Sequence, residues 1–508
     1  MSPPFVGVYR PEDGQLYCQD LPTTPDASIG TVLVTGGTGY IGGRLVPELM
    51  ARGYRVRVMV RAFSPEYAKK WPKAEIVVAD ASDTASLSLA LKGVHTAYYL
   101  IHSLLLGPKE FEAMDLANAG NFRRAAEENG LARIIYLGGL GDVRTFLSPH
   151  LRSRARVAEE LGNGSIPVTV LRAAVIIGSG SASYEIIEHL VRRLPVMLIP
   201  SWGRTKCQPI SVRDVIKYLV GVLEKREIAG DSFDIGGQDI LTYEQMLMIF
   251  AEVLGKKRLF IPSSFSRVGF SAYLAGLLTP VPVPITRSLM EGLLNDVVCD
   301  DSRLAAILPF RTLSYRDAVF RALSHEEQDG VYTRWSDAYP PANELAVKLH
   351  DLPAPPRYTT VYSILTDRKA GALFGSICRI GGKEGWFRGN WMWRLRGMLD
   401  RIFMGVGTAR GRKRRSTLNV NDVIDFWRVE VLEPNRRLLL RAEMKLPGRA
   451  WLDFKIEPEG TANRLSVQAF YDTMTFFGRV YWYMFLPFHW YIFENLLLQI
   501  EKRSQSVK

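Results

Sequence analysis

Cysteine is scarce in this chain of 508 residues, and the four cysteines lie far apart. They are Cys18, Cys207, Cys299 and Cys378, with no Cys-x-x-Cys pair and no histidine cluster nearby. Disulfide-stabilised domains carry closely spaced cysteines, and zinc sites need paired Cys or His ligands. The spacing therefore argues against a disulfide framework or a metal site, and it fits a reducing compartment.

Long hydrophobic runs are also missing. A membrane-spanning helix needs roughly 18 or more predominantly apolar residues in succession. The nearest approaches are Val268–Thr286, which glycines and prolines interrupt, and Val480–Phe493, which contains Pro487 and His489. Met1–Ser28 is polar and proline-rich and lacks the apolar core of a signal peptide, so we interpret it as a loose extension. We therefore expect a cytoplasmic protein without a spanning helix.

The remaining composition is that of a globular protein with two or three domains. Hydrophobic residues make up 47% of the chain, and the mean hydropathy is near zero. Pro340-Pro341 and the prolines between residues 353 and 356 indicate a linker. We therefore divide the chain into an N-terminal extension (1–28), a first domain (29–345), a proline-rich linker (346–356) and a second domain (357–508).

A glycine-rich segment follows the first apolar strand pattern. Thr31–Thr35 is β-branched and apolar, and it leads into Gly36-Gly37-Thr38-Gly39-Tyr40-Ile41-Gly42 and then a helical pattern. In such a turn the first glycine makes the bend, the second lets the backbone approach a pyrophosphate, and the third lets the helix pack on the strand. The helix N-terminus adds N–H donors and a positive dipole. The segment predicts a dinucleotide site on a doubly wound parallel sheet.

The ends of the next two strands indicate which nucleotide is preferred. Tyr54–Val60 is the second strand, and Arg61 follows it where an NAD-preferring site would place Asp or Glu. A guanidinium favours a 2′-phosphate through a charge-assisted contact, so we expect NADP, with NAD less favoured. The alternative is a solvated surface arginine. The third strand, Glu75–Ala79, leads to Asp80 and Ala81, where Asp80 would reach the adenine amino group.

The fourth strand, Thr96–Ile101, ends next to His102. Strand ends in this architecture face the nicotinamide side of the crevice. We therefore take Leu100 and His102 as candidates for contact with cofactor or substrate. The alternative is that His102 is a loop histidine that only fixes the backbone.

These motifs resemble the extended and atypical short-chain dehydrogenase/reductase superfamily. The resemblance rests on Thr35–Gly42, Arg61 and Asp80–Asp83. Tyr99–Ser103, Tyr136–Gly141 and Gln208–Asp214 are similar to a bacterial group of fused proteins. In that group a Rossmann-fold reductase domain precedes a domain of unknown function that resembles the START-like (SRPBCC, polyketide-cyclase-type) fold. The resemblance covers about residues 30–505 and leaves the substrate open.

The catalytic pair of that superfamily is absent. Its members normally carry Tyr-x-x-x-Lys on the helix after the fifth strand, and the Tyr passes the proton. Here Arg133–Leu137 leads into two glycines, and the next helix carries His150-x-x-x-Arg154 at the corresponding place. His150 can relay a proton, and Arg154 can bind ribose hydroxyls. The catalytic candidates are His150, Arg154 and His102, and the alternative is a site that binds the dinucleotide without chemistry.

Two regions complete the first domain. Val168–Ile177 reads as a sixth strand. Residues 255–345 are apolar and rich in proline, which predicts a small substrate region in which helices cover an apolar cleft.

The second domain reads as a strand, helices, several strands and a long final helix. Asn390–Val406 is amphipathic, with strands expected at 358–365, 423–432, 436–446, 450–457 and 463–471 and a helix at Phe476–Ile500. This order resembles an α+β helix-grip (START-like) fold, in which a curved sheet wraps a long helix and commonly encloses an apolar ligand. Trp427, Glu443, Lys445 and Trp451 are candidates for lining such a cavity.

Positive charge is concentrated in one stretch of the second domain. Between Arg379 and Arg415, eleven Lys and Arg residues stand against Glu384 and Asp400, so the stretch carries +9 of the chain's net +12. Trp386, Phe387, Trp391 and Trp393 are interleaved with these charges. Four interpretations are open: a solvated face, peripheral contact with the anionic inner face of a membrane, a dock for an acidic ligand or domain, and nucleic-acid binding, which no reading motif supports.

Two functions of different class follow from these patterns. The first is an NADPH-dependent oxidoreductase acting on an apolar ligand that the second domain binds or delivers. The second is a non-catalytic NADP(H)-binding sensor or assembly factor, similar in role to the NAD(P)H-binding accessory subunit of respiratory complex I. The fused ligand-binding domain favours the first, and the missing Tyr–Lys pair favours the second.

Overall fold

The computed structural model describes residues 16–102, 111–141, 147–264, 267–300, 303–327, 333–338, 347–382, 385–386, 390–402, 405–407, 410 and 418–504. The chain divides into two compact units, one formed by residues 1–279 and 283–341, the other by residues 280–282 and 342–508. Within the described residues, no helix is long and apolar enough to cross a membrane. Those residues also contain no group of three or more His, Cys, Asp or Glu that could hold a metal ion.

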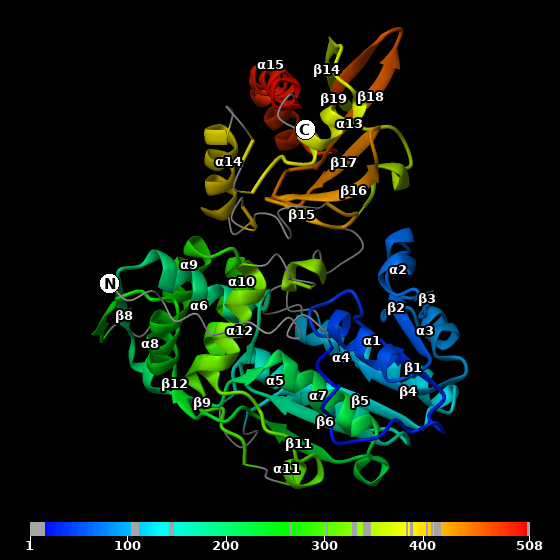
Figure 1. Ribbon diagram of the computed structural model, residues 1–508, viewed down its shortest axis with the longest axis vertical. Coiled ribbons are helices and arrows are strands. Elements are labelled where there is room, and N and C mark those ends of the chain that lie inside the picture. Colours follow the sequence, from blue (N-terminus) through cyan, green and yellow to red (C-terminus); the bar gives the residue numbers. More distant parts are fainter. Residues whose placement is uncertain are drawn as a thin grey trace. The chain divides into compact units, whose positions relative to one another are not determined.

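The first unit is built on a seven-stranded parallel sheet (Figure 1). Its spatial order is β11 (Ser232–Ile235), β6 (Val168–Ala173), β5 (Arg133–Gly139), β4 (Val94–Tyr99), β1 (Thr31–Val34), β2 (Val56–Val60) and β3 (Glu75–Val78). Strands that helices cover on both faces of a sheet have continuous apolar sequences. Val32-Leu33-Val34 in β1 is such a sequence, and all three side chains are fully buried. The strand order reverses between β1 and β4, and α/β proteins bind ligands at the carboxyl ends of strands at such a point.

Helices cover both faces of this sheet. On one face α1 (Gly42–Ala51) and α7 (Val212–Leu223) share a core with β1 and β2. On the other face α3 (Thr84–Leu91), α4 (Phe111–Glu128) and α5 (Pro149–Gly162) pack their apolar sides on β4 and β5. A short helix, α2 (Pro65–Lys70), precedes β3. The predicted doubly wound parallel sheet is therefore confirmed.

The remainder of the first unit contains helices and three two-stranded pairs. The helices are α6 (Ala182–Arg193), α8 (Tyr243–Val253), α9 (Val268–Leu278), α10 (Val283–Glu291), α11 (Arg303–Ile307) and α12 (Tyr315–Glu327). The pairs are β7 (Ile176–Ile177) with β10 (Ile210–Ser211), β9 (Lys206–Cys207) with β12 (Leu241–Thr242), and β8 (Val196–Ile199) with β13 (Leu259–Pro262). The prediction of a single strand over Val168–Ile177 is wrong. Strand β6 ends at Ala173, and Ile176–Ile177 form the separate strand β7, which pairs with β10.

The segment expected to form a lid is helical. Helices α9 and α10 pack on each other, and Ala272, Ala275 and Met290 form a small apolar core between them. An apolar cleft beneath these helices stays a prediction.

The N-terminal segment is not loose where the structure describes it. Cys18 and Leu21 are buried in the core of the first unit. The carboxylate of Glu48 accepts hydrogen bonds from the backbone N–H groups of Tyr17 and Cys18, the latter over 3.1 Å. The expectation of a loose extension is therefore wrong for residues 17–28, because helix α1 supplies polar partners that a local reading of the segment cannot see.

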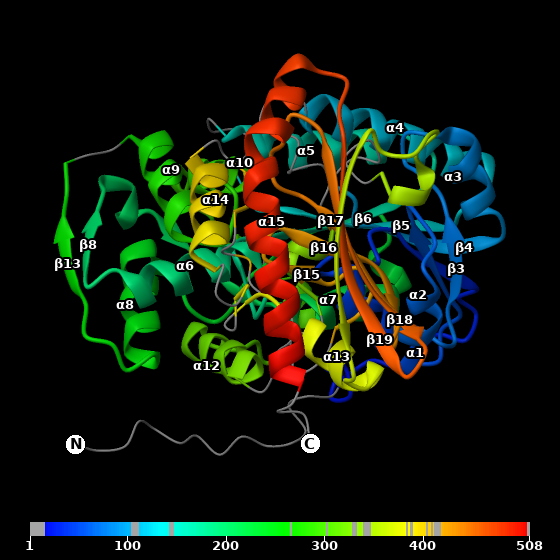
Figure 2. The same cartoon turned by 90° about the horizontal axis from the view of Figure 1, so that it is seen from above.

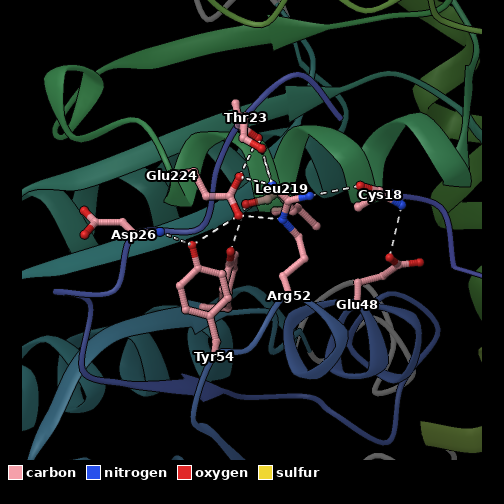
Figure 3. Close-up of polar contacts among 9 residues, drawn as sticks. Cys18, Thr23, Asp26, Glu48, Arg52, Tyr54, Leu219 and Glu224 are labelled. Atoms are coloured by element: carbon pink, nitrogen blue, oxygen red, sulfur yellow. Dashed lines mark hydrogen bonds and ion pairs between the residues drawn. The ribbon is translucent and has the colours of Figure 1, made fainter. Parts of the chain in front are cut away.

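Glu224, which follows α7, fastens the same segment at its other end (Figure 3). It accepts two hydrogen bonds of 2.7 Å from the guanidinium of Arg52, one of 3.1 Å from the hydroxyl of Tyr54, and one from the hydroxyl of Thr23. Tyr54 in turn accepts from the backbone N–H of Asp26 over 3.1 Å. The side chains of Arg52 and Glu224 are only 13% and 0% exposed, so this ion pair is shielded from water.

We expect Glu224→Gln to lower the free energy of unfolding by about 3 kcal/mol, because it leaves the shielded charge of Arg52 without its counter-ion. The control is Glu75→Gln, which removes the partner of Arg57 from a pair whose carboxylate side chain is 58% exposed. That change should cost less than about 1 kcal/mol. Urea denaturation followed by tryptophan fluorescence measures both, and equal losses would contradict the account.

The second unit contains a six-stranded antiparallel sheet. Its order is β14 (Tyr358–Thr366), β19 (Ala462–Asp472), β18 (Arg449–Glu459), β17 (Arg437–Ala442), β16 (Trp427–Glu433) and β15 (Val423–Ile424). The long helix α15 (Phe476–Ser504) packs against β14, β19 and α13 (Ala370–Ile377), as Figure 2 shows. Trp482 contacts the rings of Tyr358 and Tyr471. The strands and the final helix lie within a few residues of their predicted positions.

The residues proposed to line a cavity are mostly buried in the second unit. Trp427 and Trp451 are almost fully buried. The carboxylate of Glu443 binds Arg410 over 2.8 Å and Arg428, with Arg441 at 3.5 Å. Burial acts to raise the pKa of Glu443, but Arg428 and Arg410 outweigh it and hold that pKa below its usual value. Glu443 therefore belongs to a buried ion cluster, while Lys445 is exposed.

The basic stretch is not one uniform surface. Trp386 and Trp393 stack with ring centroids 4.4 Å apart, and both are buried beside Trp427. The indole N–H of Trp386 donates to Asp425 over 2.9 Å. Trp391 is exposed, whereas Phe387 and residues 411–415 lie outside the described residues. Of the interleaved tryptophans, two are therefore core residues.

Candidate functional site

The turn after β1 accepts only glycine at several positions. Gly36 has φ of +62°, and a Cβ there would lie 2.8 Å from the carbonyl oxygen of Leu100. A Cβ at Gly42 would lie 2.4 Å from the carbonyl oxygen of Gly36, and one at Gly37 would meet Val58 at 2.3 Å. The glycines therefore let α1 begin directly against the turn, as a backbone cradle for a phosphate requires.

Thr35 joins the two strand ends on either side of the reversal point. Its hydroxyl donates to the carbonyl of Tyr98 over 3.0 Å and accepts from the backbone N–H of Leu100 over 2.9 Å. This contact fixes the end of β1 to the end of β4, where Leu100 was expected to meet the cofactor. The sequence signal for this contact is Thr35 itself, whose hydroxyl follows three apolar residues at the end of the strand pattern.

The N-terminus of α1 is suited to an anion. Its N-cap residue, Ile41, has no side chain that can accept from the first-turn N–H groups. Arg44, also in the first turn and only 7% exposed, donates to the carbonyls of Tyr40 (3.1 Å) and Ser179 (2.9 Å). The helix dipole and this buried guanidinium add positive potential beside the turn. This positive potential is the electrostatic environment that a pyrophosphate requires.

A distant segment closes one side of this turn. The guanidinium of Arg44 also donates to the carbonyl of Thr333 over 3.1 Å, and the hydroxyl of Thr333 donates to the carbonyl of Tyr40 over 2.9 Å. Glu185 holds the same segment by accepting from Arg334 over 2.6 Å and from the indole of Trp335 over 2.7 Å. Sequence reasoning missed these contacts, since nothing local links residue 44 to residue 333.

The candidate adenosine contacts lie at two adjacent strand ends. Strands β2 and β3 pair in parallel as far as Val60 and Val78, so Arg61 and Asp80 follow neighbouring ends. Arg61 is exposed. One carboxylate oxygen of Asp80 accepts from the backbone N–H (2.9 Å) and hydroxyl (2.6 Å) of Ser82, and the adjacent Ala81 is buried. Asp80 thus shapes its own turn, and its contact with adenine stays a prediction.

The structure brings the three catalytic candidates together. His102 follows β4, while His150 and Arg154 lie on α5, and each histidine is close enough to Arg154 for its charge to act on the imidazole. Arg154 donates to the hydroxyl of Tyr136 over 3.4 Å, and that hydroxyl donates to the carbonyl of Arg154 over 3.3 Å. Tyr136, buried on β5, was not among the predicted residues and positions Arg154.

Asp115 supports the same group from α4. It is buried, and one of its carboxylate oxygens accepts from the hydroxyl of Ser153 over 3.4 Å. Burial acts to lower the pKa of Arg154, but Tyr136 and Asp115 more than offset it. The guanidinium is therefore a permanent positive charge at this end of the sheet.

Both histidines are held in the neutral form. Burial, followed by the charge of Arg154, lowers the pKa of His150 to about 3. His102 is exposed, yet surrounding atoms desolvate its imidazole and, with Arg154 and His150, lower its pKa well below the usual range. At neutral pH these imidazoles can form hydrogen bonds or accept a proton, but they do not hold an extra proton ready for donation.

We predict that Arg154→Met raises the pKa of both histidines, because it removes the positive charge that opposes their protonation. Arg152→Met is the matched control on the same helix, since Arg152 pairs with Glu112 instead. Carbon-detected NMR titration of the imidazoles, assigned with His150→Asn, provides the measurement. Unchanged pKa values in Arg154→Met would show that its charge does not reach the histidines.

The lowered pKa of His150 also fixes the sign of its effect on stability. Because the unfolded chain binds this proton more readily, the contribution of His150 is complete above the unfolded value of about 6.5 and is lost as the pH falls toward about 3. His150→Asn should therefore weaken the loss of stability on acidification. The midpoint of urea unfolding, measured from pH 7 to pH 4, tests this sign.

Comparison with known proteins gives two matches to protein families. Residues 28–289 match the NmrA-like family. Residues 353–496 match a family described as a protein of unknown function, DUF2867. The two matches fall on the two compact units, and the first covers the turn, the sheet and the helices that build the candidate site.

Three curated relatives are similar to slightly less than half of the chain. The chloroplastic divinyl chlorophyllide a 8-vinyl-reductase of Zea mays is 28% identical over 253 residues, which is 46% of this chain and 62% of the relative. The mitochondrial NADH dehydrogenase [ubiquinone] 1 alpha subcomplex subunit 9 of Arabidopsis thaliana is 25% identical over 45% of this chain and 59% of its own length. The ceramide reductase of Caulobacter vibrioides is 26% identical over 45% and 72%, respectively. The chain thus spans only about 60% of the first two relatives.

Proposed function

Since the chain belongs to the NmrA-like family, we propose that its first unit binds NADP(H) and serves as an oxidoreductase acting on an apolar ligand. The observation that carries this proposal is the glycine turn, where a Cβ at Gly36, Gly37 or Gly42 has no room and α1 begins directly after β1, beside the reversal point of the sheet. Such a turn holds the pyrophosphate of a dinucleotide.

The residues around the turn have separate tasks in this proposal. Arg61 binds the 2′-phosphate of the adenosine ribose, and Arg154 binds the hydroxyls of the nicotinamide ribose. NADPH, when bound, supplies a hydride to the substrate. His102 follows β4 and His150 lies on α5, and both imidazoles are neutral, so they orient the substrate by hydrogen bonds or relay a proton that arrives from water.

Two observations support an apolar ligand. The relatives from Zea mays and Caulobacter vibrioides are named as reductases of divinyl chlorophyllide a and of ceramide, molecules with large apolar parts. In the second unit, a long helix packs across an antiparallel sheet, an arrangement that supports the helix-grip interpretation. In this proposal the second unit binds or delivers the ligand.

The second candidate is an NADP(H)-binding protein without catalysis. Helix α5 contains neither Tyr nor Lys, and its one histidine is neutral at physiological pH. The relative from Arabidopsis thaliana is named as a subunit of NADH dehydrogenase. Under this candidate, cofactor binding changes the stability of the first unit or its binding to a partner, and no substrate is turned over.

Cofactor preference tests the proposed role of Arg61. NADPH should bind more tightly than NADH by about 1–3 kcal/mol for one charge-assisted contact, and Arg61→Asp should erase or reverse the difference. Arg55→Asp is the matched control, because Arg55 is exposed just before β2, at the opposite end of the strand from Arg61. Isothermal titration calorimetry measures all three proteins. Equal affinities of the wild type for NADPH and NADH would overturn the assignment.

Turnover separates the two candidate functions. Ligands that copurify with the protein are identified by mass spectrometry and tested for NADPH oxidation. If the protein is an enzyme, His150→Ala should lower turnover by about 10²–10⁴-fold with little change in NADPH affinity, since the glycine turn is untouched. Arg154→Ala should weaken NADPH binding as well. Binding of NADPH without turnover of any recovered ligand would contradict the oxidoreductase proposal and favour the non-catalytic function.

A further inference from the structure

Helix α14 (Asn390–Ile402) presents its apolar stripe to the outside. Trp391, Leu395, Met398, Leu399 and Ile402 share one side of the helix, and each is between 40% and 62% exposed. The residues that the helix buries are Trp393, Gly397, Asp400 and Arg401. A surface helix of a globular protein normally places its apolar stripe against the core. The orientation of α14 is the reverse.

Polar contacts fix this orientation. Asp400, which is 1% exposed, accepts from the backbone N–H of Gly407 over 2.8 Å and from that of Lys445 over 2.7 Å. Arg396 donates to the carbonyl of Lys445 over 2.9 Å and to the hydroxyl of Tyr481 over 3.3 Å. Rotating the stripe inward would break all four hydrogen bonds and leave the backbone N–H groups of Gly407 and Lys445 without their acceptor. These hydrogen bonds therefore keep the apolar stripe of α14 exposed.

The start of α15 extends the same surface. Tyr481 joins the two helices through Arg396, and both views show α14 beside α15 (Figures 1 and 2). In the first half of α15, Phe476, Phe477, Tyr483, Met484, Trp490 and Tyr491 are between 50% and 77% exposed. We call these six residues and the five of the α14 stripe the aromatic face. Exposed apolar patches of this kind mark interaction surfaces.

Basic residues outnumber acidic ones around the aromatic face, although Glu494, one helical turn after Trp490, is only half-buried. In α14, in residues 444–449 and in residues 475–492, the exposed charged residues are Arg394, Lys445, Arg449 and Arg479. The only acidic residue in these three segments is Asp400, which is buried. The surface therefore combines tryptophan, tyrosine and phenylalanine with a mainly basic rim.

We propose that the aromatic face docks on an anionic lipid bilayer, with α14 and the start of α15 lying in the plane of the headgroups. Tryptophan and tyrosine favour the membrane interface because their rings are apolar and their N–H and O–H groups bond to water and headgroups. The four basic residues are attracted to the negative surface potential of anionic lipids. With a rise of about 1.5 Å per residue, residues 476–491 of α15 would contact the membrane surface over a length of roughly 24 Å. This inference goes beyond the proposed function and does not depend on cofactor binding.

Vesicle flotation with the full chain tests the docking. Wild-type protein should float with vesicles of phosphatidylcholine containing about one third phosphatidylglycerol, bind several-fold less to pure phosphatidylcholine, and lose binding as salt is raised. Trp391→Ser with Leu395→Ser, and separately Phe476→Ser with Phe477→Ser, should each lower the partition coefficient by about tenfold or more. Arg394→Glu with Arg479→Glu should remove the preference for phosphatidylglycerol.

The matched controls replace residues of similar exposure in the first unit, away from the aromatic face. Leu198→Ser with Leu259→Ser removes two residues that are 65% and 57% exposed on β8 and β13, and Lys256→Glu with Lys257→Glu reverses two exposed charges in the first unit. Both controls should bind vesicles as the wild type does, and circular dichroism confirms that every variant is folded.

Three results would overturn the proposal. The first is a wild type that floats with neither kind of vesicle. The second is serine variants on the aromatic face that bind like the wild type or like the controls. The third is a wild type that is dimeric by light scattering and becomes monomeric in the serine variants without any change in flotation, because the aromatic face would then be covered by a second copy of the chain.

Discussion

The close approach of α1 to the turn before it is the constraint on which the first unit depends. A Cβ at Gly42 would lie 2.4 Å from the carbonyl oxygen of Gly36, so the helix can begin there only without a side chain. This contact directs the N-terminus of α1 toward the place where the strand order reverses. Thr35 then fixes the neighbouring strand ends, and Arg44 adds a buried positive charge beside the turn. The anion-binding geometry is a result of backbone packing, with side chains supplying charge around it.

The local patterns of the sequence predicted those parts of the fold that local physics determines. The glycines from Gly36 to Gly42 indicated the turn, and alternating residues placed the strands of the second unit to within a few positions. Hydrophobic periodicity also identified the helix beginning at Asn390. It gave no information on which side of that helix faces the core, because Asp400 and Arg396 decide this through partners about 45 and 85 residues away. Long-range polar contacts of this kind do not appear in any local pattern.

The same limit explains the other differences. Residues 17–28 look like a polar extension, but Glu48, Arg52 and Glu224 bind them from other elements. His150 and Arg154 were predicted from their spacing on one helix, whereas Tyr136 and Asp115, which hold Arg154, lie on β5 and α4. These partners hold the positive charge that, together with burial, lowers the pKa of both imidazoles.

The central claim is that the turn from Gly36 to Gly42 holds the pyrophosphate of NADP(H). A crystal structure of the protein grown with NADPH tests this most directly. The account predicts pyrophosphate oxygens on the backbone N–H groups at the start of α1, the 2′-phosphate beside Arg61 and the nicotinamide near His102, His150 and Arg154. Electron density for the nucleotide at another place, or a fully occupied ligand whose pyrophosphate does not touch this turn, would contradict it.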